Sequence, residues 1–187
     1  MPTIAIFTDG EKTETNYFLG LCKELRLVAV RLKSDYVHLE GTGFDPVTLV
    51  THAVERAGDY DETWVVFDRD DHTNKFDNAI ALANTHGVKV AYSNECFELW
   101  LILHFERLET DIGRNQYFQK LGTLLGRKYR KNDIEIFNMV KSREGVAIRT
   151  SKSLEKMHDD NGVIPSHKRA PSTTVFRLVE RLRELRK

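Results

Sequence analysis

Acidic residues follow an apolar run at 63–67, and their spacing suits the binding of a divalent cation. Asp68 and Asp70 come directly after this run, with Asp71 beside them. Two carboxylates one residue apart at the end of an extended strand lie on the same side, about 6–7 Å apart along the chain. Hard cations such as Mg²⁺ take oxygen ligands, usually one or two carboxylates together with substrate phosphates. The pattern indicates metal-assisted phosphoryl transfer, although an isolated Asp-x-Asp more often only closes a turn.

Two further acidic clusters stand at equivalent positions along the chain. They are Asp9, Glu11 and Glu14 after the apolar run at 3–8, and Glu95 and Glu98 after the run at 88–93. Acidic residues are common in loops, where they cap helices and close turns. Ligands of open α/β sheets, however, bind at the carboxyl ends of the strands. The coincidence of three clusters at strand ends therefore favours one shared metal site.

Several polar residues near these clusters allow a functional or a structural role. Glu98, in the first turn of a predicted helix, is a candidate for the active site, or a buried glutamate bonded to loop amides. His104 is six residues further on and so on a different face of the helix, which favours a hydrogen-bonded core histidine. His72 could contact a phosphate or stand in solvent. Lys12 could meet a phosphate at a helix N-terminus or be an ordinary exposed lysine.

The charges are divided unevenly along the chain, although the formal net charge is zero. Residues 1–100 carry 17 acidic and nine basic residues, whereas residues 101–187 carry 11 acidic and 19 basic ones. The densest basic run is Arg127, Lys128, Arg130 and Lys131, with Tyr129 among them. It could neutralise phosphates and stack a base, or be a solvated loop. Together with the C-terminal arginines it favours a nucleic-acid partner.

Alternating strand and helix patterns position these residues in the first hundred. Strands are predicted at 3–8, 34–39, 63–67 and 88–93, and helices follow from Thr13, from Pro46 capped by Asp45, at 74–85 and at 96–105. We expect Thr13 to cap the first helix. Such alternation predicts an α/β fold, a mostly parallel sheet with helices on both faces.

The pattern changes near residue 108. Helical segments are predicted near 115–125, 133–141 and 143–158, and a last helix from Pro171. We therefore expect an α/β core at 1–107 and a helical, basic extension at 108–187, packed on the core as a single globular unit.

The composition excludes several classes of protein. Of the 187 residues 41% are hydrophobic, which is too many for a disordered chain. No apolar run approaches the roughly 20 residues that span a bilayer, and the first residues do not read as a signal peptide. Cys22 and Cys96 lie inside apolar patterns and are expected to be buried thiols, as in a reducing cytoplasm.

Four motifs, spread over nearly the whole chain, resemble those of the RloB-like family. Residues 9–18, Asp-Gly-Glu-Lys-Thr-Glu-Thr-Asn-Tyr-Phe, are similar to the family's opening Glu-Gly-Glu-Lys-Thr-Glu-x-x-Tyr-Phe. Residues 66–72 resemble its Asp-x-Asp motif, residues 93–105 its Ser-Asn-Pro-Cys-Phe-Glu-x-Trp-Leu-Leu-Leu-His-Phe block, and residues 171–175 its C-terminal motif. The family has a Toprim-like fold and is associated with restriction loci and phage defence.

The resemblance implies a cytoplasmic, metal-dependent nuclease of an abortive-infection system, with Mg²⁺ or Mn²⁺ as cofactor. It implies catalytic roles for Asp9, Glu11, Asp68 and Asp70, metal ligation by Asp9, Asp68 and Asp70, and possible support from Glu14, Glu98, Lys12 and His72. The implied partners are DNA or RNA and a companion ATPase from the same locus. No membrane is implied, and a homo-oligomer is possible.

Two departures from the family pattern affect this expectation. Asp9 stands where the family has glutamate, which shortens the side chain by one methylene, and Glu95 replaces a proline. Glu95 could add a carboxylate to the site or lie in solvent. The alternative is therefore a catalytically weak or inactive Toprim-like module that binds nucleic acid or the ATPase. A phosphatase with a nucleophilic aspartate is disfavoured, because His72 stands where such enzymes have Thr or Val.

Overall fold

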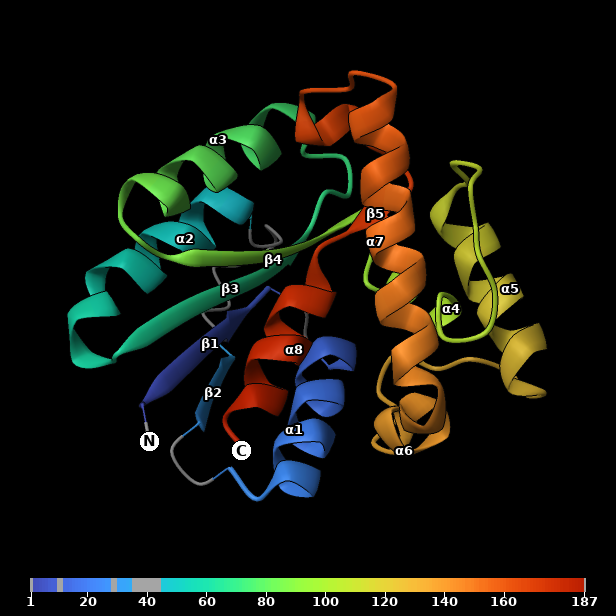
Figure 1. The fold of residues 1–187 in the computed structure, drawn as a ribbon, viewed down its shortest axis with the longest axis horizontal. Helices are drawn as coiled ribbons and strands as arrows, with labels where there is room; N and C mark the ends of the chain where they lie inside the picture. The colour runs from blue at the N-terminus through green and yellow to red at the C-terminus, as the bar shows by residue number, and fades with distance from the viewer. Residues whose placement is uncertain (1, 10–11, 28–29, 35–44, 187) are drawn as a thin grey trace, which may run out of the picture.

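A five-stranded sheet forms the centre of the protein (Figure 1). The computed structural model describes residues 2–9, 12–27, 30–34 and 45–186. The strands lie in the order β2-β1-β3-β4-β5, and the first four are parallel. They are β1 Ile4–Thr8, β2 Val30–Ser34, β3 Glu62–Asp68, β4 Lys89–Asn94 and β5 Ser172–Thr173. The predicted α/β class with a mostly parallel sheet is confirmed.

Helices cover both faces of this sheet, as the sequence predicts. They are α1 Thr13–Leu25, α2 Pro46–Glu55, α3 Thr73–Thr85, α4 Glu98–Ile102, α5 Arg114–Leu125, α6 Ile136–Val140, α7 Glu144–Asp160 and α8 Val175–Glu184, with short 3₁₀ turns at Ala57–Asp59, Lys141–Arg143 and Ser166–Lys168. Figure 1 shows α2 and α3 on one face of the sheet, and α1 beside α8 on the other. Within the described residues, no helix is both long enough and apolar enough to cross a membrane.

Side chains of the central strands alternate between two separate cores. Ala5 and Phe7 of β1 point to the side of α2 and α3, where they pack with Phe67 and Phe76. The neighbouring Ile4 and Ile6 belong to a larger core, which contains buried side chains from α1 as well as from the C-terminal helices α6, α7 and α8. Both faces of the strands are therefore apolar, as a covered parallel sheet requires.

The C-terminal segment completes the sheet, which the sequence did not predict. Residues Ser172 and Thr173 pair antiparallel with Asn94 and Ser93 of β4. The Thr173 hydroxyl donates to the Tyr92 carbonyl at 3.1 Å, and the Tyr92 amide donates to the Thr174 hydroxyl at 2.9 Å. These bonds fix an extended backbone, so the last helix begins at Val175 and not at Pro171.

Other boundaries also differ from the predicted ones. A strand was predicted at 34–39, but β2 occupies Val30–Ser34, and residues 35–44 lie outside the described part of the chain. Of the predicted helix at 96–105, only Glu98–Ile102 is α-helical. Asp45 caps α2 as predicted, through its side chain to the amides of Val47 and Thr48. The two cysteines are buried free thiols.

Candidate active site

The end of β3 and the turn after it place Asp68 and Asp70 at the carboxyl edge of the sheet. The amide of Arg69 donates to the Ser93 carbonyl at 2.9 Å, and the amide of Asp70 donates to the Glu95 carbonyl at 3.2 Å. These bonds fasten the turn to the end of β4. Asp70 has a φ of 45°, in the left-handed region, which costs an L-residue roughly 1–2 kcal/mol. Asp68 is thus the last residue of β3, whereas Asp70 is held by the turn that follows the strand.

Both aspartates approach one guanidinium group. Arg114, the first residue of α5, forms an ion pair with Asp70, and its Nη2 lies 4.0 Å from Asp68 Oδ2. The Asp68 side chain is nearly buried, whereas those of Arg114 and Asp70 are about one-third exposed. Arg114 therefore stands at the solvent side of the site.

Asp9 joins Asp68 because their strands are neighbours. The Asp68 amide donates to Asp9 Oδ2 at 3.1 Å, and the Asp9 amide donates to the Val66 carbonyl at 3.1 Å. Two of the predicted carboxylates thus meet at the ends of β1 and β3. Glu11, the remaining predicted catalytic residue, lies outside the described residues.

Two buried glutamates form the inner side of the same cluster. Glu14, in the first turn of α1, is 6% exposed, and Glu98, at the start of α4, is 1% exposed. The Tyr129 hydroxyl donates to Glu98 Oε1 at 2.8 Å and lies 3.1 Å from the Thr13 hydroxyl. The Thr13 hydroxyl donates to the Lys131 carbonyl at 2.6 Å, so it fastens a distant loop instead of capping α1 as predicted.

Burial and neighbouring negative charge raise the pKa of three carboxyl groups in this cluster. Removal of the carboxyl group from water, followed by the negative charge of Glu14, raises the pKa of Asp9 to about 8. Burial and the charge of Glu98 raise the pKa of Glu14 to about 7. Burial and the charges of Glu14, Asp9 and Glu98 raise the pKa of Asp68 well above its usual value. The cluster therefore concentrates more negative charge than its surroundings neutralise, and a cation would relieve it.

The donor chemistry of the cluster fits Mg²⁺ or Mn²⁺, because all of its side-chain ligands are carboxylate oxygens. Within the described residues, however, no three carboxylate, imidazole or thiol groups are arranged to enclose one metal ion. A closed set is not required for Mg²⁺, which keeps several waters and binds substrate phosphates. Asp9, Asp68 and Asp70 are the residues that would hold it, and Asp70 is at present paired with Arg114.

The other candidates from the sequence lie at the margin of this site or away from it. Lys12 is an exposed residue at the N-cap position of α1, and His72, half-buried, holds the equivalent position before α3. Glu95 lies 3.8 Å from the Arg69 guanidinium and is neither a member of the cluster nor free in solvent.

His104 is a core residue, as the sequence favours. Its side chain is fully buried, and Nδ1 is 2.9 Å from the Trp100 carbonyl. Burial lowers the pKa of His104 to about 4, so the imidazole is neutral near pH 7.

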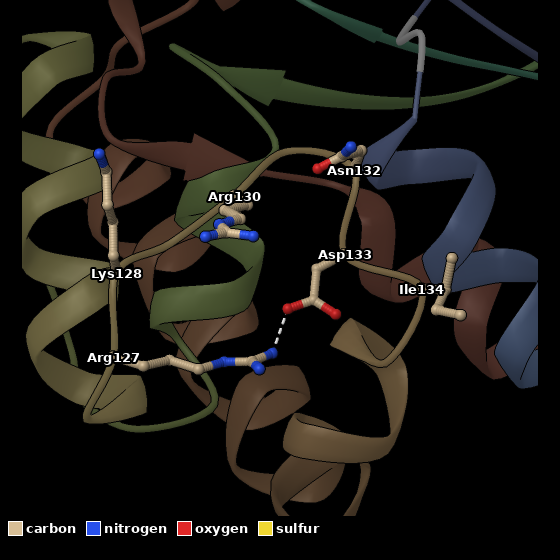
Figure 2. Close-up of a pocket in the computed structure, with 6 residues that line it drawn as sticks. All are labelled: Arg127, Lys128, Arg130, Asn132, Asp133 and Ile134. Atoms are coloured by element: carbon tan, nitrogen blue, oxygen red, sulfur yellow. Dashed lines mark hydrogen bonds and ion pairs between the residues drawn. The ribbon is translucent and has the colours of Figure 1, made fainter.

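The predicted basic run forms a loop between α5 and α6 with a pocket of about 530 Å³ (Figure 2). Its lining residues are Arg127, Lys128, Arg130, Asn132, Asp133 and Ile134. Figure 2 shows Arg127 reaching across the pocket to Asp133, with which it forms an ion pair, while Lys128 extends away from that pair. Within the described residues, Lys128 and Arg130 have no carboxylate partner, so their charges face solvent.

Tyr129, in the middle of this loop, is half-buried and contacts the protein through both its ring and its hydroxyl. Its ring centroid lies 5.7 Å from that of Phe118, and its hydroxyl reaches Glu98 inside the carboxylate cluster. The loop therefore has two sides. The Tyr129 hydroxyl contacts the cluster, and Lys128 and Arg130, its neighbours in the chain, are exposed to solvent.

Three contributors to the site were not identified from the sequence: Arg114, Tyr129 as a partner of Glu98, and Thr13 as the anchor of the loop. Arg114 gives little signal, because it is a single arginine at a helix start, 44 positions from Asp70. Only its place after Gly113, in a first turn where positive charge is unfavourable for the helix dipole, marks it as unusual.

Comparison with protein families identifies a relationship over most of the chain. The model of a family described as "RloB-like protein" matches residues 4–182. Neither the curated proteins nor the solved structures contain a significant match to this chain.

Proposed function

The chain belongs to the RloB-like family, and from this premise and its carboxylate cluster we propose that it is a metal-dependent nuclease. The proposed reaction is hydrolysis of phosphodiester bonds in DNA or RNA with Mg²⁺ or Mn²⁺. The observation that carries it is the convergence of Asp9, Glu14, Asp68 and Glu98 at the carboxyl edge of the sheet, where burial and the neighbouring charges raise the pKa values of the first three. Such perturbed groups are typical of functional sites.

Different residues of the site would hold the cation and exchange a proton. Asp68, Asp70 and Asp9 would hold the ion, which polarises the phosphate and supplies a water of lowered pKa when bound. The pKa of Glu14 is raised to about 7, which suits a carboxyl group that exchanges a proton near neutral pH. Tyr129 orients Glu98 behind it through the 2.8 Å hydrogen bond.

The basic loop supports a polyanionic substrate at this site. Lys128 and Arg130 are exposed beside Tyr129, whose hydroxyl contacts the cluster. A phosphate chain held by this loop therefore passes close to the carboxylates. Each phosphate contact of this kind contributes through release of counterions, so the binding should weaken with salt.

Cleavage of labelled DNA and RNA tests the proposal. The wild-type protein should cleave at least one substrate with Mg²⁺ or Mn²⁺ and not with EDTA. Asp68→Asn, which replaces one ligand oxygen by an amide group without changing the shape, should lower the rate at least about 100-fold. Asp71→Asn is the matched control, because Asp71 is exposed in the same turn. Equal rates for wild type and Asp68→Asn would contradict the assignment of the site.

A second candidate function is a binding module without catalysis. It is favoured by the open arrangement of the described carboxylates, no three of which enclose one ion, and by Asp9 in place of the family's glutamate. In this case nucleic acid binds, and Arg130→Ala weakens the binding, but no substrate is cleaved under any metal condition.

The biological setting of the proposal is phage defence, with a companion ATPase as the partner. It rests on family membership. Co-expression with the ATPase gene of the same locus, followed by size-exclusion chromatography and a phage plating assay, would test it. Unchanged plating with and without the intact gene pair would argue against this setting.

A further inference from the structure

Arg114 is the one described cation in direct contact with the two aspartates of the Asp-x-Asp motif. It forms an ion pair with Asp70 and lies 4.0 Å from Asp68. Asp70 has a left-handed backbone and is held by the Glu95 carbonyl, so its position is fixed by the turn. The guanidinium is thus directed at the carboxylate that a divalent cation at this site would also need.

The location of Arg114 does not favour a purely structural ion pair. It is the first residue of α5, where the helix dipole is unfavourable for a positive charge and favourable for an anion. The side chains of the pair are both about one-third exposed, and ion pairs in such positions contribute little to stability. The guanidinium is also accessible from solvent, on the side from which a substrate approaches.

An arginine that is released from its ion pair with an aspartate is well suited to bind a phosphate. Its planar fork matches carboxylate and phosphate oxygens equally well. An arginine and a divalent cation that contact the same carboxylate repel each other, because both are positively charged. The two therefore compete for that carboxylate.

We propose that Arg114 is a stand-in cation of this site, which pairs with Asp70 while no divalent cation is bound and binds a phosphate of the nucleic-acid substrate when a divalent cation takes Asp70. This inference rests on the proposed function. It assigns to one residue two effects of opposite sign, because Arg114 weakens the binding of metal and strengthens the binding of substrate.

The test is the affinity of the full-length chain for Mn²⁺, measured by calorimetry at pH 8, followed by the affinity for a labelled oligonucleotide in the presence of Ca²⁺. Arg114→Gln should bind Mn²⁺ about three- to tenfold more tightly than wild type and the oligonucleotide about three- to tenfold more weakly. For Arg114→Gln, the slope of the logarithm of oligonucleotide affinity against the logarithm of salt concentration should be smaller by about one released counterion. Arg114→Lys keeps the charge and loses the planar fork of donors. Its affinities for Mn²⁺ and for the oligonucleotide should lie between those of the wild type and Arg114→Gln.

Arg177→Gln is the matched control, because it also removes one arginine that pairs with an acidic residue, Glu155, away from the site. It should leave the Mn²⁺ affinity unchanged. If the wild type binds Mn²⁺ and Arg114→Gln binds it equally tightly or more weakly, the inference about Arg114 is wrong, whereas the metal site is supported. Absence of Mn²⁺ binding in both proteins would overturn the metal site and the inference together.

Discussion

Replacement of Glu14 by glutamine should stabilise the protein at pH 8 and have little effect at pH 4. Glu14 is buried beside Glu98, and burial and this negative charge raise its pKa from 4.5 to about 7. The folded protein therefore binds more protons than the unfolded chain between these pH values. Its free energy of unfolding falls as the pH rises through this range.

The size of the effect follows from the shift. A difference of one pKa unit corresponds to about 1.4 kcal/mol, so the shift of Glu14 costs up to about 3 kcal/mol at pH 8. Glutamine has nearly the same shape and carries no charge, so Glu14→Gln should remove this cost. For a chain of this length, 3 kcal/mol raises the melting temperature by about 6–12 °C.

The assay is urea unfolding of wild type and Glu14→Gln at pH 8 and pH 4, in EDTA. Glu109→Gln is the control, because Glu109 is exposed and forms a surface ion pair with Arg107. It should change the free energy of unfolding by less than about 0.5 kcal/mol at either pH. If Glu14→Gln destabilises the protein equally at both pH values, Glu14 is not electrostatically disfavoured, and the description of the cluster is wrong.

Two further predictions concern the core. Gly20→Ala should lower the free energy of unfolding by about 1–3 kcal/mol in urea, because the added Cβ would lie 2.6 Å from Phe137 Cβ. Gly145→Ala, whose Cβ would meet only the end of the Arg149 side chain at 3.6 Å, should be neutral or stabilising by up to about 1 kcal/mol; equal effects of the two would refute the packing argument. Folding lowers the pKa of His104 from 6.5 to about 4, so the unfolded chain binds more protons than the folded protein in this range. The free energy of unfolding therefore decreases as the pH is lowered. Wild type should lose about 2 kcal/mol more than His104→Leu between pH 7 and pH 5, and equal losses would show that His104 is not buried as a neutral group.

The sequence predicts the sheet well where the strands are long and apolar. β1, β3 and β4 have runs of buried residues on both faces. Asp9, after β1, and Asp68, at the end of β3, meet because parallel strands end at one edge. β5 was missed because two residues carry no periodicity, and only their pairing with Ser93 and Asn94 of β4 makes them a strand.

The residues of the site that lie at strand ends were predicted, whereas those from distant segments were not. Asp9 and Asp68 come from neighbouring strands, so their meeting follows from topology. Arg114 and Tyr129 reach the cluster from α5 and the loop after it, far along the chain. Such contacts depend on tertiary packing, and local patterns do not encode them.

The most direct test of the proposed metal site is a crystal structure of the protein soaked with Mn²⁺ at pH 8, with anomalous data. We expect a Mn²⁺ peak within about 2.0–2.3 Å of carboxylate oxygens of Asp68 and at least one of Asp9 and Asp70, and no such peak in Asp68→Asn. Absence of a peak at this edge of the sheet in wild-type crystals, at a Mn²⁺ concentration that supports cleavage, would contradict the proposed metal site.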